Sequence, residues 1–126
     1  MATKIYTDGF PIDYPANVVQ GNTHYMSLQI GDGDPNDQNS FTPWDLSADD
    51  AAFKIVSGTS GTALVEYTQA DNITLDDNGN IVVKIEPAES AIVPAGKHNM
   101  ALVLSRDNGD VYTVFTGVYC SIKKPF

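Results

Sequence analysis

The sequences ITLDDNGNIVVKI at residues 73–85 and MALVLSRDNGDVYTVF at residues 100–115 decide the fold. In each of them, Asn-Gly separates two runs of mostly apolar residues. Both central residues of a type I′ turn need a positive φ, which Asn and Gly tolerate, and the twist of this turn matches that of two paired strands. The two stretches therefore predict two β-hairpins, with Asn78-Gly79 and Asn108-Gly109 as their loops.

The second hairpin also predicts a register. With Asn108 and Gly109 as the loop, three pairs of residues face each other: Leu104 and Thr113, Leu102 and Phe115, and Met100 and Gly117. Beyond Gly117 the apolar residues move to the opposite parity, at positions 118, 120 and 122. A β-bulge would restore the phase, and glycine tolerates one. We therefore expect a bulge at Thr116-Gly117.

Strand patterns continue on the N-terminal side of these hairpins. Residues 23–30 alternate with a period of two, which puts every second residue from His24 to Ile30 on one face. Residues 52–57 and 62–68 read as two further strands joined by a glycine-rich turn.

The spacing of these segments predicts the fold class. Pro87 and Pro94 bracket one short helical turn near residues 87–92. The pattern indicates an all-β fold, a two-sheet antiparallel sandwich of about seven to eight short strands. A chain of 126 residues fits one such domain.

Residues 1–22 differ from the rest of the chain. They hold the isolated aromatic residues Tyr6, Phe10 and Tyr14, with Pro11 and Pro15 between them. The two prolines remove backbone donors and exclude a central strand there. Spaced aromatic rings need a surface to bury against, which is either the chain's own domain or a neighbouring subunit. We therefore divide the chain into an extended N-terminal arm, residues 1–22, and a sandwich domain, residues 23–126.

Composition restricts the classes of partner. Sixteen acidic and seven basic residues give a net charge of −9. Such a surface repels phosphate backbones, so we expect no nucleic-acid binding. No apolar run approaches the length of about 20 residues that spans a membrane, so we expect no membrane partner. The single cysteine has no partner for an internal disulfide.

Residues that carry catalytic or metal chemistry are scattered. His24, His98 and Cys120 are far apart in the sequence, and no glycine-rich phosphate loop is present. We therefore expect no enzyme activity, no catalytic residues, no metal site and no cofactor. The loop at residues 32–37 begins like a calcium-binding EF-hand loop but lacks the glycine at position six and the glutamate at position twelve. Cation binding by this loop stays open.

Trp44 allows two interpretations. A tryptophan of this size usually packs in the core, here between two sheets. Alternatively, it forms an aromatic platform for a sugar ring, as in a carbohydrate-binding module, together with a nearby tyrosine. The candidate tyrosines are Tyr25, Tyr67, Tyr112 and Tyr119.

An ordered set of short motifs extends over residues 41–118. PWDLS at residues 43–47 is followed by ITLDDNGNI at 73–81, PAE at 87–89, VPAGK at 93–97 and FTG at 115–117. The set resembles small immunoglobulin-like β-sandwich proteins of tailed-phage virions, in particular the N-terminal domain of upper-baseplate and fibre-adaptor proteins. The resemblance implies an immunoglobulin-like sandwich.

The same resemblance implies a non-enzymatic structural protein of the virion, assembled in the cytoplasm of the bacterial host. Its implied partners are other virion structural proteins, including further copies of itself. Only four residues, 123–126, follow the last predicted strand, so we expect an accessory tail, baseplate or fibre-adaptor subunit. The alternative is a capsid-decorating protein. The expected docking residues are Tyr6, Phe10, Pro11, Tyr14, Pro15 and Phe126.

Overall fold

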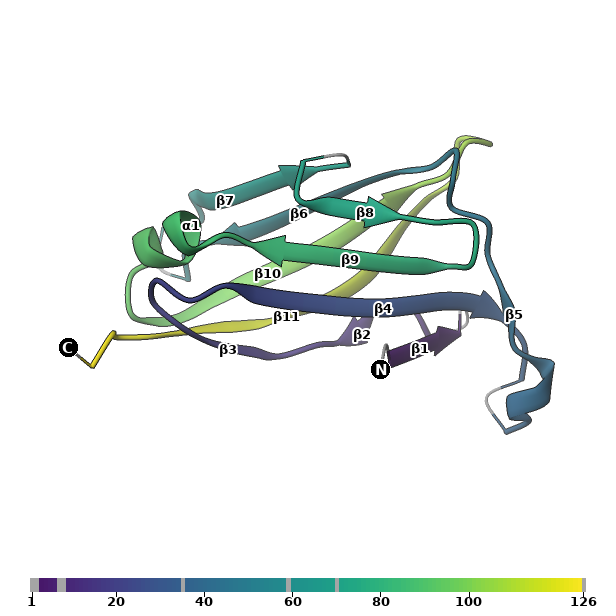
Figure 1. Cartoon of the computed structure of the whole chain (residues 1–126), viewed down its shortest axis with the longest axis horizontal. Coiled ribbons are helices and arrows are strands. Elements are labelled where there is room, and N and C mark those ends of the chain that lie inside the picture. Colours follow the sequence, from purple (N-terminus) through teal and green to yellow (C-terminus); the bar gives the residue numbers. More distant parts are fainter. Residues whose placement is uncertain (1–2, 7–8, 35, 59, 70, 126) are drawn as a thin grey trace.

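Two β-sheets pack face to face in the computed structural model, which describes residues 3–6, 9–34, 36–58, 60–69 and 71–125 (Figure 1). Sheet A contains β1 (Thr3–Tyr6), β4 (His24–Asp32), β5 (Thr42–Pro43), β8 (Ile73–Leu75) and β9 (Asn80–Ile85). Sheet B contains β2 (Ile12–Asp13), β3 (Ala16–Val19), β6 (Asp50–Val56), β7 (Ala63–Thr68), β10 (Gly96–Ser105) and β11 (Val111–Ile122). The predicted all-β sandwich is confirmed.

The strand order shows how the chain moves between the sheets. Sheet A runs β1-β4-β9-β8, with β5 also paired to β4, and sheet B runs β2-β11-β10-β6-β7, with β3 also paired to β11. The helix α1 (Pro87–Ile92) lies where the helical turn was expected and carries the chain from β9 in sheet A to β10 in sheet B. A short 3-10 helix, Gln38–Ser40, lies between β4 and β5. No helix in the described ranges is long and apolar enough to cross a membrane.

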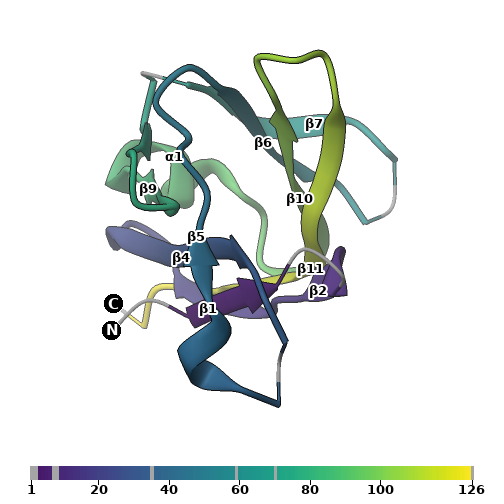
Figure 2. The ribbon, with the colours of Figure 1, turned by 90° about the vertical axis from the view of Figure 1, so that its right-hand side faces the viewer.

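The N-terminal segment makes both sheets mixed rather than purely antiparallel. β1 pairs with β4 in parallel, and both β2 and β3 pair with β11 in parallel. The described residues between 3 and 19 therefore lie along one side of the sandwich, instead of extending from it as a separate arm (Figure 2). Pro11 and Pro15 stand just outside these short edge strands, where no backbone donor is required.

Both hairpins form, but their loops are not the expected type I′ turns. Among the described residues other than glycine, only Asn72 has a positive φ, so Asn78 and Asn108 do not adopt it. Gly79 and Gly109 do, with φ of 78° and 96°. This is the geometry of a three-residue loop that ends on a left-handed glycine.

Hydrogen bonds hold each loop in this form. The Asp76 carboxylate accepts from the backbone N–H groups of Asn78 and Asn80, at 2.9 Å each. In the second loop, the Arg106 N–H donates to the Asp110 carbonyl oxygen at 2.7 Å.

The predicted register of the second hairpin is partly right. Leu102 faces Phe115 and Met100 faces Gly117, as expected. Leu104, however, faces Tyr112 instead of Thr113, because the register shifts between Leu102 and Val103. The extra residue on β11 is Val114, so the expected bulge at Thr116-Gly117 is wrong. Val114 and its neighbour Phe115 are both fully buried.

Gly117 serves a different purpose. The chain crosses from β2 to β3 at Tyr14, whose N–H donates to the Thr116 carbonyl oxygen at 2.9 Å. A Cβ atom on Gly117 would overlap the carbonyl oxygen of Tyr14. The missing side chain therefore leaves the space in which the N-terminal segment approaches β11.

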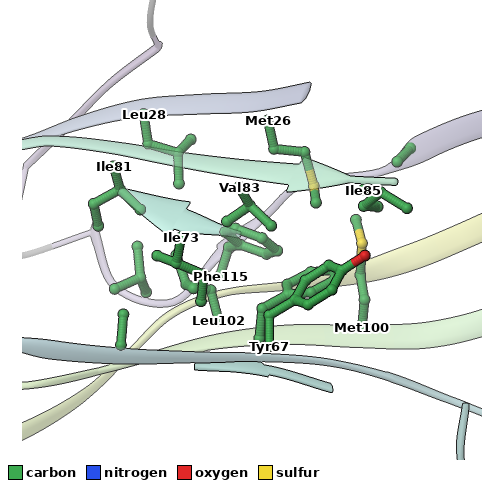
Figure 3. Packing of buried hydrophobic residues seen from close by; sticks show 14 of the residues in the cluster. Met26, Leu28, Tyr67, Ile73, Ile81, Val83, Ile85, Met100, Leu102 and Phe115 are labelled. Atoms are coloured by element: carbon green, nitrogen blue, oxygen red, sulfur yellow. The ribbon is translucent and has the colours of Figure 1, made fainter. Parts of the chain in front are cut away.

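The core lies between the two sheets, and strand alternation places its residues. Met26, Leu28 and Ile30 are fully buried on one face of β4, as predicted. Figure 3 shows the residues of sheet A that point toward sheet B: Met26, Leu28, Ile73, Ile81, Val83 and Ile85. They meet Tyr67, Met100, Leu102 and Phe115 from sheet B.

Gly117→Ala should destabilise the fold because the new methyl group displaces the Tyr14 backbone. We expect a loss of about 1–3 kcal/mol in the free energy of unfolding, measured by denaturant titration. Gly9→Ala is the matched control, since a Cβ at Gly9 meets no atom within 4 Å. Equal stability of the two variants would show that Tyr14 does not need this space.

Candidate interaction surface

Three aromatic rings meet at the end of the sandwich that carries the β10–β11 loop. Phe10 follows β1, Trp44 follows β5 and Tyr112 lies on β11. The ring centroids of Trp44 and Tyr112 are 5.5 Å apart, and that of Phe10 lies 6.3 Å from Trp44 and 6.0 Å from Tyr112. The structure thus brings together two residues that the sequence suggested for different functions, Phe10 and Trp44.

An ion pair supports this aromatic cluster. The Arg106 Nε atom lies 2.7 Å from Asp49 Oδ2, and the two side chains are 22% and 2% exposed. The Asp49 carboxylate also accepts from the Asp107 N–H at 2.9 Å. The guanidinium carbon of Arg106 lies 4.0 Å from the centroid of the Trp44 ring, which is a cation–π contact. The sequence analysis missed both Arg106 and Asp49, although Arg106 is the only arginine in the chain.

Trp44 is half-buried at the end of the sandwich, neither in the core between the sheets nor free on the surface. Arg106 covers its ring, and its indole Nε1–H donates to Asp32 Oδ2 at 2.9 Å. Tyr112 is its tyrosine neighbour, whereas Tyr67 and Tyr119 are buried in the core. These contacts give Trp44 a structural role, and sugar stacking on its exposed part stays a prediction.

The other expected docking residues also contact the chain's own domain. The Tyr6 ring meets the Phe41 ring edge-on with centroids 5.2 Å apart. Tyr14 stacks on the core residue Phe115 at 5.1 Å. Both tyrosines remain half-buried, so part of each ring faces solvent.

The two prolines between these rings, Pro11 and Pro15, are exposed. Phe126, the last of the expected docking residues, lies outside the described residues. Whether the N-terminal residues dock on another subunit stays a prediction.

His98 and Cys120 lie one register position apart on the paired strands β10 and β11 but face opposite sides of sheet B. His98 is buried, where its Nδ1 atom accepts from the Gly58 N–H at 3.3 Å and its Nε2 atom lies 2.7 Å from the Pro94 carbonyl oxygen. Cys120 lies on β11, and His24 begins β4, where burial lowers the pKa of its imidazole. Within the described ranges, no three His, Cys, Asp or Glu side chains are placed to hold a metal ion.

Two carboxylates of the acidic loop after β4 serve as caps for the local backbone. Asp34 Oδ1 accepts from the Asn36 N–H at 2.9 Å, and Asp37 Oδ1 accepts from the Asn39 N–H at 3.1 Å. Such side-chain contacts to nearby backbone groups are the usual reason for Asp in turns. They give Asp34 and Asp37 a role in the local backbone, and cation binding by this loop stays open.

Tyr67 connects the core to α1. Its hydroxyl donates to Glu89 Oε1 at 3.2 Å and accepts from the Glu86 N–H at 3.3 Å. Burial raises the pKa of Tyr67 to about 12, and burial has the same effect on Tyr119. Both phenols are therefore neutral core groups at physiological pH, and neither acts as a base.

Arg106→Ala should destabilise the loop end of the sandwich. The substitution leaves the buried Asp49 carboxylate without its cation and uncovers Trp44, so we expect a loss of about 2 kcal/mol or more. Denaturant unfolding followed by the fluorescence of Trp44, the single tryptophan, measures the change. The double variant Arg106→Ala/Asp49→Asn should recover part of the loss. No recovery would mean that Arg106 acts through Trp44 alone.

No protein-family model matches the chain, and no curated protein matches it in sequence. The solved structures that match this chain include the following two. The N-terminal domain of phage TP901-1 ORF48 is 11% identical, with 95% of each chain covered and a TM-score of 0.55. CopC from Methylosinus trichosporium OB3b is 10% identical, with 89% of this chain and 87% of that chain covered and a TM-score of 0.48. At these identities the similarity concerns the fold.

Proposed function

We propose that this chain is a non-enzymatic structural subunit of a bacteriophage virion, an accessory tail, baseplate or fibre-adaptor component. The observation that carries the proposal is the similarity to a phage protein domain over 95% of both chains. The order of the motifs at residues 41–118 points to the same class of protein independently. A head-decorating subunit is the alternative position in the particle.

Several potentially reactive side chains make structural contacts within the fold, which supports a structural role for the chain. Both ring nitrogens of His98 are engaged by backbone groups, and the Asp49 carboxylate is engaged by Arg106 and the Asp107 backbone. Tyr67 holds α1 against the core. These groups stabilise the connections between strands, as expected of a subunit that serves as a rigid building block.

The N-terminal segment is the proposed docking region. Its described strands lie at an edge of each sheet, so a neighbouring subunit can reach them (Figure 2). Pro11 and Pro15 are exposed there, and the rings of Tyr6, Phe10 and Tyr14 are half-buried. Prolines restrict the backbone and expose no N–H donors, so little conformational entropy is lost when such a surface is covered. Phe126 completes the proposed set.

Peptides of this chain should be present in purified particles of the phage that encodes it. We expect mass spectrometry to find them in the tail fraction after heads and tails are separated. Recovery from the head fraction instead would favour the decorating alternative. Absence from intact particles would contradict the proposed function.

Backbone amides in the N-terminal segment should be protected in the particle. We expect hydrogen exchange at residues 9–19 to slow by about tenfold or more relative to the free protein, because docking suppresses local opening. The β8–β9 loop, residues 76–80, is the internal control and should not change. Equal exchange of residues 9–19 in both states would remove this segment as the docking region.

A further inference from the structure

The outer faces of the two sheets differ in chemistry. Successive residues of a strand point to opposite faces, so the outward residues follow from the burial pattern. On sheet A the outward residues of β4, β8 and β9 are mostly polar: Tyr25, Ser27, Gln29, Thr74, Val82 and Lys84. On β6, β10 and β11 of sheet B, the outward residues are apolar at Ala52, Val56, Ala101, Val103, Val111, Val118, Cys120 and Ile122, and polar at Asp50, Lys54, Lys97, Asn99, Ser105, Thr113 and Thr116. We call this second set the outer β10–β11 face.

A solvent-facing side of an antiparallel sheet normally carries polar residues. About half of the outward residues on the outer β10–β11 face are apolar, a larger share than on sheet A. A shallow hollow of about 490 Å³ lies on this face, lined by Lys54, Val56, Asn99, Met100, Ala101, Thr116, Gly117 and Val118. An exposed apolar surface of this kind marks a contact with another macromolecule.

The charge distribution identifies the partner. The chain carries sixteen acidic residues, yet β10 and β11, its two longest strands, contain no Asp or Glu. The outward acids of sheet B lie at its margins: Asp13 on β2, Asp50 at the start of β6 and Glu66 on the edge strand β7. Glu66 is paired with Lys54 at 3.8 Å. Two copies with a net charge of −9 repel each other least where this face meets itself.

We propose that a second copy of this chain packs on the outer β10–β11 face, with the same face of both copies in contact around a two-fold axis. A self-complementary patch is the defining property of such a contact. That the second copy is a neighbour in a virion rests on the proposed function, but the self-association itself does not. A stable dimer buries about 800 Å² per partner. The outer β10–β11 face spans only three strands, so we expect weaker association than in such a dimer. This contact still forms at the high local concentration of subunits in an assembly.

The salt dependence of dimerisation distinguishes this contact from an electrostatic one. The net charge opposes a contact between the two apolar faces, so added salt should strengthen the dimer by screening the repulsion. A head-to-tail contact between the acidic loops of one copy and the lysines at residues 123–124 of another would weaken instead. A dimer that weakens with salt would therefore overturn the proposal.

Sedimentation equilibrium of the full chain tests the face directly. Val118, 40% exposed, lines the hollow, and Ile92, 64% exposed, lies on α1 outside this face. Val118→Asp and Ile92→Asp change the net charge equally. We expect Val118→Asp to raise the dimer dissociation constant by about tenfold or more and Ile92→Asp to leave it nearly unchanged. A monomeric wild-type chain, or equal effects of the two variants, would overturn the proposal.

Alkylation of Cys120 tests the interface in the wild-type protein, so no substitution is needed. Cys120 is the only cysteine and lies on the same face, beside Val118 and Ile122. Its rate of alkylation by iodoacetamide should fall as the wild-type protein is concentrated. A rate independent of protein concentration would overturn the proposal. If the chain is monomeric in solution but present in particles, this interface alone is refuted. If the chain dimerises but is absent from particles, the proposed function alone is refuted.

Discussion

β11 holds this sandwich together because it is paired on both sides along most of its length. β10 covers one edge, and β2 and β3 cover the other. Between β2 and β3 the backbone of Tyr14 passes into the space that Gly117 leaves empty, and the Tyr14 ring stacks on Phe115. A single close approach therefore joins the beginning of the chain to its last strand, and both the core and the proposed docking region depend on it.

Local patterns predicted the elements of the fold but not their distant pairing. The alternation around Met26 and the apolar runs beside each Asn-Gly determine which residues are buried, because burial on a strand follows a period of two. The parallel pairing of residues 12–19 with β11 joins segments about a hundred positions apart, and no local pattern contains that information. The turn type was missed because a left-handed glycine also suits a three-residue loop, in which Asn78 and Asn108 keep a negative φ.

The candidate site was also predicted only in part. Spaced aromatic residues correctly indicated that residues 1–22 need a surface, and Tyr6, Phe10 and Tyr14 find part of it on Phe41, Trp44 and Phe115. The role of Arg106 was not visible, because its partners Asp49 and Trp44 come from a segment far away in the sequence. An arginine that is the only one in its chain, next to an Asn-Gly loop, was the available signal.

The position of the acidic residues links the fold to assembly. Turns require Asp to cap backbone N–H groups, so the acids gather in the loops, many of them at the end of the sandwich that holds the β4–β5, β8–β9 and β10–β11 connections (Figure 1). The two longest strands, β10 and β11, contain no acidic residue. A subunit built in this way keeps its acidic loops in solvent while its flat faces and its N-terminal edge remain available for packing against neighbours.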